Sequence, residues 1–505
     1  MRMPVHSLKW DANLPRAAAT PAGRNAFGAE RMRWWNAWLF PIGFLGALVV
    51  VADGLMRGAS ATPFESSGPL QYEPNPAAYV FAAAMLPFSL LYAARARATR
   101  AEGLLLWFVL CTVVYTKDFS YIRWPTLPIF VSDLVLALLL LAVFLCKKHR
   151  GPHLAFPVAL PVLLFLLVGS VDFAASVYQE RDMLLAARDY ALVGYPLFLV
   201  VGFYLTKDRE SVARLFLFFV LAALLATLNG MACFAIQPDE RRYILYGAYI
   251  LVAFLGVLIS LNARLLRARW GLPALGALAA GILLYNSRAI YVSLASGLCF
   301  LALTGICWMP KGFRVTARRT LIVLLLAAGF LLTLTLQIRQ GASLLTRTAE
   351  DLESGFLHFS EDPNAEFRFM AWAEAWRRFG ENPLLGEGFG VPFVFYIFEA
   401  DPRPHNTYLT VLYKMGIVGF LPLSILLGGF FLMGTRAIIR HGSHEQSIRL
   451  YLVLVGQVVT SVYGAFALLL ESPFLASIFW LSVGVGMRII SLLEVTGETP
   501  RLIRR

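Results

Sequence analysis

The sequence predicts an all-α membrane protein: a polytopic transmembrane helical bundle of about 12–14 spans, with one large periplasmic loop that contains amphipathic helices. Two observations support this class. Apolar residues make up 58% of the 505 residues and charged residues only 15%, with a mean hydropathy of +0.66. Apolar runs of roughly 20 residues, the length that a helix needs to cross a bilayer, recur along the chain. A soluble protein could not bury so much apolar surface, and the runs do not alternate as barrel strands do.

Fourteen apolar runs are candidate spans. They lie at 34–54, 77–95, 103–119, 124–146, 154–172, 189–206, 211–236, 241–262, 270–285, 288–308, 319–337, 406–434, 449–470 and 474–493. The first run is too long for the apolar part of a cleaved signal peptide, so we expect a retained span. The run 406–434 is long and could begin with a segment that lies on the membrane surface.

Lysine and arginine favour cytoplasmic loops, and their distribution predicts that both termini are cytoplasmic. In this orientation every inside loop is basic, and the inside segments hold most of the 44 basic residues. The chain then divides into five parts. These are a basic cytoplasmic tail (1–33), transmembrane helices 1–11 (34–337), a periplasmic loop (338–405), transmembrane helices 12–14 (406–494) and a cytoplasmic tail (495–505).

The net charge of +13 is no sign of nucleic-acid binding, because the basic residues sit mostly in short loops between spans. We therefore expect no nucleic-acid partner. The five cysteines lie in or beside apolar runs without any C-x-x-C spacing, which indicates neither a disulfide framework nor a metal site. We expect no cofactor and no bound metal.

The loop 338–405 contains one clear helical pattern, at 366–380 (EFRFMAWAEAWRRFG). Its apolar and aromatic side chains form a stripe, so we expect this helix to lie along the membrane surface. The following segment, 382–390 (NPLLGEGFG), is rich in glycine. A nucleotide-binding loop is disfavoured, since no strand precedes the glycines and no GK[ST] follows them. A tight turn is the better interpretation.

Arginines stand at the predicted outer ends of several spans, against the topological preference. Arg188, Arg288 and Arg403 are of this kind. Snorkelling to lipid headgroups explains any single one of them. As a set they indicate a pocket for a phosphorylated ligand, because guanidinium groups bind phosphate oxygens in pairs and stay charged at any pH.

His405 is the best candidate for acid–base chemistry. It lies where the long loop re-enters the bilayer, and an ordinary histidine pKa near 6.5 lets it accept a proton at neutral pH. Taken alone, a histidine in a loop is more often a solvated bystander than a catalytic residue. The residues that follow it favour the catalytic interpretation.

Residues 405–419 (HNTYLTVLYKMGIVG) fit the pattern H-[NSQ]-x9-G-x-x-G. This stretch resembles the bacterial O-antigen ligase and O-antigen (exopolysaccharide) polymerase superfamily. Arg368, Trp372 and the segment 382–390 resemble the large periplasmic loop of that family, and Ser287-Arg288 resembles its Ser-Arg element. Arg188 resembles an outer-face arginine upstream. The overall organisation is similar from about residue 120 to residue 490, with specific motifs in 286–288 and 366–419.

The resemblance implies a metal-independent, inverting glycosyltransferase in the bacterial inner membrane. Such an enzyme transfers a glycan from undecaprenyl diphosphate to a sugar hydroxyl of an acceptor glycan or of lipid A–core, in polysaccharide or lipopolysaccharide biosynthesis. It implies that His405 is the catalytic base and that Arg188 and Arg288 bind the diphosphate. Arg368 and Arg403 are weaker candidates.

The number of spans slightly favours a polymerase over a ligase. A protein O-oligosaccharyltransferase is a further possibility. From another class, a lipid-linked glycan flippase or other secondary transporter is the main alternative. It would favour two related halves and ionisable groups near the membrane midplane, neither of which is visible. A purely structural membrane component would not explain the arginines and the histidine.

Overall fold

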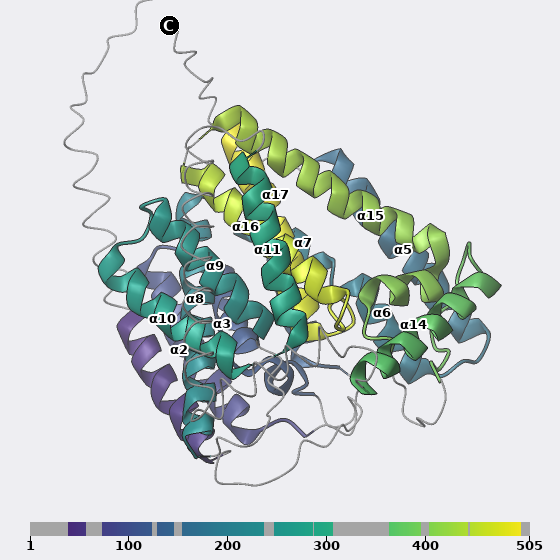
Figure 1. Ribbon diagram of the computed structural model, residues 1–505, viewed down its shortest axis with the longest axis horizontal. Helices are drawn as coiled ribbons and strands as arrows, with labels where there is room; N and C mark the ends of the chain where they lie inside the picture. The colour runs from purple at the N-terminus through teal and green to yellow at the C-terminus, as the bar shows by residue number, and fades with distance from the viewer. Residues whose placement is uncertain are drawn as a thin grey trace, which may run out of the picture.

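The computed structural model describes residues 39–56, 73–123, 129–145, 154–236, 247–285, 287–306, 363–394, 403–442 and 445–495, which are almost entirely helical (Figure 1). The helices, in chain order, are Leu39–Met56, α2 (Pro76–Arg95), α3 (Arg100–Ser120), α4 (Val131–Leu145), α5 (Phe156–Tyr178), α6 (Met183–Gly194), α7 (Leu197–Leu205), α8 (Arg209–Ile236), α9 (Gly247–Asn262), α10 (Ala268–Leu284), α11 (Arg288–Ile306), α14 (Pro363–Glu381), α15 (Thr407–His441), α16 (Glu445–Gly464) and α17 (Pro473–Val495). Within these ranges the β-pairing is an isolated bridge between Arg123 and Phe130. The predicted all-α class is confirmed.

The helices make a multi-pass membrane protein. Nine helical segments of the described chain are long and apolar enough to span a bilayer, with α6 and α7 together forming one of them. Four shorter apolar helices, α4, α9, α10 and α11, accompany them. Every predicted span except 319–337 coincides with one of these helices, and 319–337 lies outside the described residues.

The sixth span begins earlier than predicted. The side chain of Asp182 accepts hydrogen bonds from the backbone N–H groups of Leu184 (2.9 Å) and Leu185 (3.0 Å), which caps α6 before residue 189. Arg188 therefore lies inside α6 and not at its opening. Pro196 separates α6 from α7, since a proline has no backbone N–H to continue the helix.

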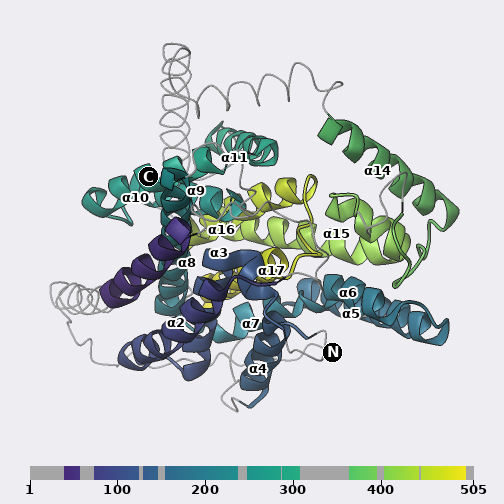
Figure 2. The same ribbon diagram turned by 90° about the horizontal axis from the view of Figure 1, so that it is seen from below.

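The middle of the bundle is formed by α3 and α17, most of whose residues are buried (Figure 2). In contrast, α5 shows Leu163, Leu167 and Val171 on its outer side, each more than half exposed. Apolar side chains exposed in this way along a long apolar helix suit contact with lipid tails.

One end of the bundle, here called the His405 end, gathers the starts of α2, α6, α15 and α17 and the end of α3. The backbone N–H of Asn75, at the start of α2, donates to the carboxylate of Asp118 near the end of α3 (3.0 Å). The ring of Tyr121, directly after α3, contacts Phe474 at the start of α17 (centroids 6.4 Å apart).

The opposite end is here called the Lys207 end. Arg488 of α17 donates to the backbone carbonyls of Thr206 (3.0 Å) and Lys207 (2.6 Å), directly after α7. Near the same end, Arg214 of α8 forms a buried ion pair with Glu102 of α3 (2.7 Å). The span Met183–Leu205 separates the two ends.

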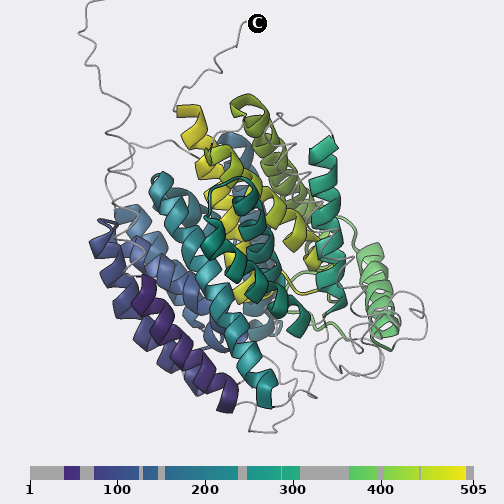
Figure 3. The same ribbon diagram turned by 60° about the vertical axis from the view of Figure 1, so that its left-hand side comes forward.

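The predicted helix in the long loop is confirmed as α14, which lies at one edge of the molecule beside the start of α15 (Figures 1 and 3). Ala371 and Ala375 on its packed face are buried together with Tyr413 of α15, and the rings of Trp372 and Phe379 pack against this cluster. Trp372 also donates to the carbonyl of Pro404 (2.8 Å). Phe369 and Trp376 are about half exposed. The aromatic residues are thus divided between contact with the protein and exposure, and the surface-lying position of this helix stays a prediction.

Candidate functional site

His405 lies two residues before α15 in a strained backbone conformation. Its φ is +49°, a value that few non-glycine residues adopt and that is often found at functional sites. Asn406 is the N-cap of α15, and its side chain accepts from the N–H groups of Tyr408 and Leu409 (both 3.1 Å). The cap fixes the direction in which the chain enters the helix, and thereby the position of His405.

The imidazole of His405 is largely buried. Its ring packs edge-on against Phe367 of α14 (centroids 6.4 Å apart). Burial, and to a smaller extent the charge of Arg368, lower the pKa of His405 to about 4. His405 is therefore neutral at physiological pH, with a ring nitrogen able to accept a proton.

The helix that follows His405 is broken at Gly416, and the segment 382–390 fills the break. Gly416 has φ +58° and ψ −163°, a combination essentially restricted to glycine. A Cβ at this position would lie 2.2 Å from the backbone oxygen of Leu384. Only a glycine lets the two backbones approach so closely.

The break frees backbone groups of α15, and the segment 382–390 binds them. The carbonyls of Tyr413 and Lys414 accept from the N–H groups of residues 387 (2.8 Å) and 388 (2.9 Å). The N–H groups of residues 417 and 418 donate to the carbonyls of Pro383 (2.9 Å) and Leu384 (3.1 Å). The tight turn predicted for 382–390 is confirmed, and its glycines 386, 388 and 390 all have positive φ.

A buried carboxylate, Asp189 of α6, ties this assembly to the bundle. Its Oδ1 accepts from Arg403 (3.0 Å), and its Oδ2 lies 3.3 Å from the ammonium of Lys414. The same Oδ2 accepts from the backbone N–H of Gly390 (3.1 Å). One side chain thus holds the residue next to Pro404-His405, the helix α15 and the glycine-rich turn.

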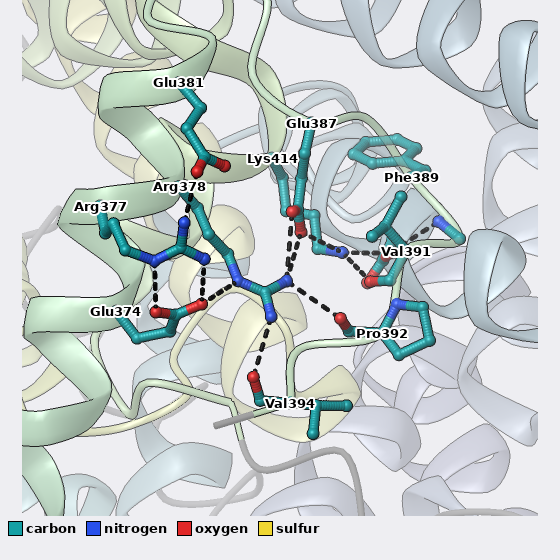
Figure 4. Close-up of polar contacts among 12 residues, drawn as sticks. Glu374, Arg377, Arg378, Glu381, Glu387, Phe389, Val391, Pro392, Val394 and Lys414 are labelled. Atoms are coloured by element: carbon teal, nitrogen blue, oxygen red, sulfur yellow. Dashed lines mark hydrogen bonds and ion pairs between the residues drawn. The ribbon is translucent and has the colours of Figure 1, made fainter. Parts of the chain in front are cut away.

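The ion pairs continue outward to α14 (Figure 4). Glu387 contacts both Lys414 (3.4 Å) and Arg378 of α14 (3.1 Å), and Arg378 also pairs with Glu374 (2.7 Å). Burial raises the pKa of Glu387, and the charges of Lys414 and Arg378 oppose that rise. The chain of ion pairs fixes α14, and with it Arg368, relative to His405.

A second cationic group surrounds Tyr121. Burial raises the pKa of its hydroxyl, and the positive charges of Arg188 and Arg403 both oppose that rise. The ammonium of Lys117 lies 5.8 Å from the centre of the Tyr121 ring and interacts electrostatically with Arg188. Because Arg403 and His405 are two residues apart, this group adjoins the histidine.

Arg288 reaches the His405 end from a different helix. It is the first residue of α11 and is half-buried. The hydroxyl of Tyr285, three residues before it, donates to the carbonyl of Ala226 in the second half of α8 (2.8 Å). The structure thus brings Arg188, Arg368 and Arg403 into the surroundings of His405 and places Arg288 at the same end of the bundle.

Sequence analysis assigned no role to Asp189, Lys414, Lys117 or Tyr121. A signal was present for Asp189, Lys414 and Lys117, because ionisable residues inside apolar runs are rarely without a partner or a function. The pairing of Asp189 with Arg403 and Lys414 was not readable, since more than 200 residues separate Asp189 from each of them.

The fold and the site together define a multi-pass helical membrane protein with a neutral histidine and several arginines at one end of its bundle. Residues 273–424 match the family model described as O-antigen ligase, which supports the O-antigen ligase and polymerase superfamily predicted from the sequence. The matched region contains Arg288, Arg368, Arg403 and His405, whereas Arg188 precedes it. Comparison with curated proteins found no match. The family implies a membrane enzyme of the ligase or polymerase type that acts on a lipid-linked glycan and an acceptor.

Proposed function

We propose that the chain transfers a glycan from undecaprenyl diphosphate to a sugar hydroxyl at the His405 end, on the periplasmic face of the bacterial inner membrane. The observation that carries this proposal is the buried, neutral His405, held by its helix cap next to Arg403 and the arginine-rich surroundings of Tyr121. A neutral base beside guanidinium groups suits attack by a hydroxyl on a glycosyl diphosphate.

In the proposed reaction, the acceptor oxygen attacks the anomeric carbon and forms a new glycosidic bond. The bond from that carbon to the phosphate oxygen breaks, and its electron pair stays on the lipid diphosphate. His405 takes the proton of the acceptor hydroxyl, and Arg188 and Arg288 stabilise the charge on the leaving phosphate. Direct attack inverts the anomeric carbon and requires neither a metal nor a covalent intermediate.

Substrate binding would also raise the pKa of His405. The charge of Arg368 lowers the pKa of His405, and the negative charge of a bound diphosphate would act in the opposite direction. His405 would then be a stronger base in the complex than in the free enzyme.

The test is an assay of purified protein with labelled undecaprenyl diphosphate oligosaccharide, offered alone and then with lipid A–core. We expect a ladder from the donor alone, which means a polymerase; a product that needs lipid A–core means a ligase. His405→Ala should lower the rate by about 100- to 10,000-fold, the usual contribution of a general base. No product from folded wild-type protein with its native donor would contradict the proposal and favour the flippase.

A further inference from the structure

The end of α3 brings a lysine and a tyrosine to the cationic group at the His405 end. Thr116, four residues before the end of α3, has φ +33° and ψ −105°, which breaks the helix inside its last turns. A β-branched residue with a positive φ is a genuine outlier, and such strain is often found at functional sites. The residues after the break, Lys117 to Tyr121, leave the course of the preceding helix.

Two neighbouring rings and one backbone hydrogen bond hold Tyr121 in place. Its backbone N–H donates to the carbonyl of Lys117 (3.0 Å), and its ring contacts Phe130 (centroids 5.2 Å apart) and Phe474 (6.4 Å). Burial raises the pKa of Tyr121, while the charges of Arg188 and Arg403 lower it. The hydroxyl is thus held, as a neutral hydrogen-bond donor, within reach of two guanidinium charges.

The cations at this place are close enough to repel one another. Lys117 and Arg188 interact as like charges, and the neighbouring Asp118 acts on Lys117 in the opposite direction. The carboxylate of Asp189 is shared between Arg403 and Lys414, so its single negative charge is divided between them. A bound anion with several oxygens would relieve this repulsion.

The geometry points to Lys117 and Tyr121 as further ligands for the phosphate oxygens of the lipid-linked donor, beside Arg188. This inference rests on the proposed function, in which Arg188 binds the diphosphate. The lysine supplies a compact charge on a flexible stem, and the tyrosine supplies a fixed neutral donor. A diphosphate has enough oxygens for these three groups and for Arg288.

The experiment measures equilibrium binding of radiolabelled undecaprenyl diphosphate to the full-length protein in phosphatidylcholine nanodiscs. The variants are Lys117→Gln, Lys117→Arg, Tyr121→Phe and Arg188→Gln. Lys207→Gln serves as the matched control, because its side chain is exposed at the opposite end of the bundle. Unlabelled undecaprenol, which has no phosphate, is the competitor that reports binding of the lipid tail alone.

We expect Lys117→Gln and Tyr121→Phe each to weaken binding of the diphosphate lipid about tenfold, typical of losing one hydrogen bond to a charged group. Lys117→Arg should restore most of the affinity. In these variants, the strength of competition by undecaprenol and the temperature of thermal unfolding should be the same as in the control Lys207→Gln. A merely structural role would lower the thermal transition and would not distinguish the diphosphate lipid from undecaprenol.

If Arg188→Gln weakens binding while Lys117→Gln and Tyr121→Phe bind like wild type, the inference is wrong and the proposed function stands. If wild type binds undecaprenyl diphosphate no more tightly than undecaprenol, the proposed function fails and the inference fails with it.

Discussion

At the scale of single residues, the proposed chemistry depends on the pKa of His405 and on the charges around it. Burial and the charge of Arg368 lower its pKa to about 4, so the folded protein keeps the imidazole neutral under conditions in which a solvated histidine is half protonated. In the unfolded chain the same group binds its proton near pH 6.5. Acidification from about pH 6.5 to about pH 4 therefore favours the unfolded chain.

The first prediction concerns the pH dependence of transfer. For wild type, the acid limb of kcat/KM should lie well below pH 6.5, because this quantity reports the pKa of His405 in the free enzyme. Arg368→Gln removes the repulsive charge and leaves the burial, so the limb should move to higher pH and stay below 6.5. Rates of glycan transfer measured across this pH range check the shift. An unchanged limb would show that Arg368 does not act on the base.

The second prediction concerns Asp189, which holds Arg403, Lys414 and the N–H of Gly390. Asp189→Asn removes the buried negative charge that Arg403 and Lys414 share, so we expect a loss of about 3–5 kcal/mol in stability. Transfer should fall at least about tenfold, since Arg403 adjoins His405 and a small displacement of catalytic groups is costly. Thermal unfolding and the transfer assay measure both effects.

The control for this variant is Asp182→Asn in the same helix. Asp182 is the exposed N-cap of α6, and asparagine caps a helix about as well as aspartate does. Equal losses in the two variants would contradict the role given to Asp189.

At the scale of elements, the site depends on two segments that complete each other. The broken helix α15 offers backbone groups at residues 413–418, and the segment 382–390 pairs with them. Each segment alone would leave backbone N–H and carbonyl groups unpaired inside the protein, at a considerable cost. The loop and the helix therefore stabilise one geometry together, and this geometry carries His405 and α14.

The third prediction tests this contact. Gly416→Ala forces a Cβ to within 2.2 Å of a backbone oxygen and an alanine into a glycine-only conformation. We expect it to lower the free energy of unfolding by about 2–4 kcal/mol and to abolish most transfer activity. Thermal unfolding in detergent, together with the transfer assay, provides the measurement.

Gly428→Ala in the same helix is the matched control. A Cβ at Gly428 meets nothing within 4 Å, so alanine should be neutral or stabilise the helix by up to about 1 kcal/mol. If Gly416→Ala had the same stability and activity as Gly428→Ala, the close contact between the segment 382–390 and the break in α15 would not be needed for the fold or the site.

At the scale of the whole molecule, the two ends of the bundle differ in chemistry. The His405 end gathers the histidine, the candidate arginines and the described part of the long loop, residues 363–394 and 403–405. At the Lys207 end, the basic residues Arg488 and Arg449 donate to backbone carbonyls of neighbouring segments. This asymmetry is what a protein with its site on one face of a membrane requires.

The fourth prediction is the orientation in the membrane. Gly380, where a side chain would meet nothing within 4 Å, and the exposed Lys207 mark the two ends. In intact cells, a maleimide that cannot cross the inner membrane should label Gly380→Cys above the background of the parent protein. It should label Lys207→Cys only after that membrane is opened. The reverse pattern would overturn the predicted topology and place the site in the cytoplasm.

The sequence by itself determined the helices and indicated the candidate residues of the site. Lipid imposes a minimum length on every span, so the apolar runs stand out, and local signals such as Asn406 mark a helix start. The motif around His405, with Arg368 and the glycines of 382–390, was likewise visible. The start of α6 was missed by six residues, because its capping Asp182 precedes the apolar run.

Only the tertiary structure decided which distant residues meet. The partners of Asp189 lie more than 200 residues away along the chain. The glycine-rich turn donates to carbonyls of Tyr413 and Lys414, and no local pattern predicts that contact. Hydrophobic periodicity is a local property that gives the length and the face of a helix. The pairing of buried charges and of broken helix backbone depends on how the helices pack together, and local patterns do not encode it.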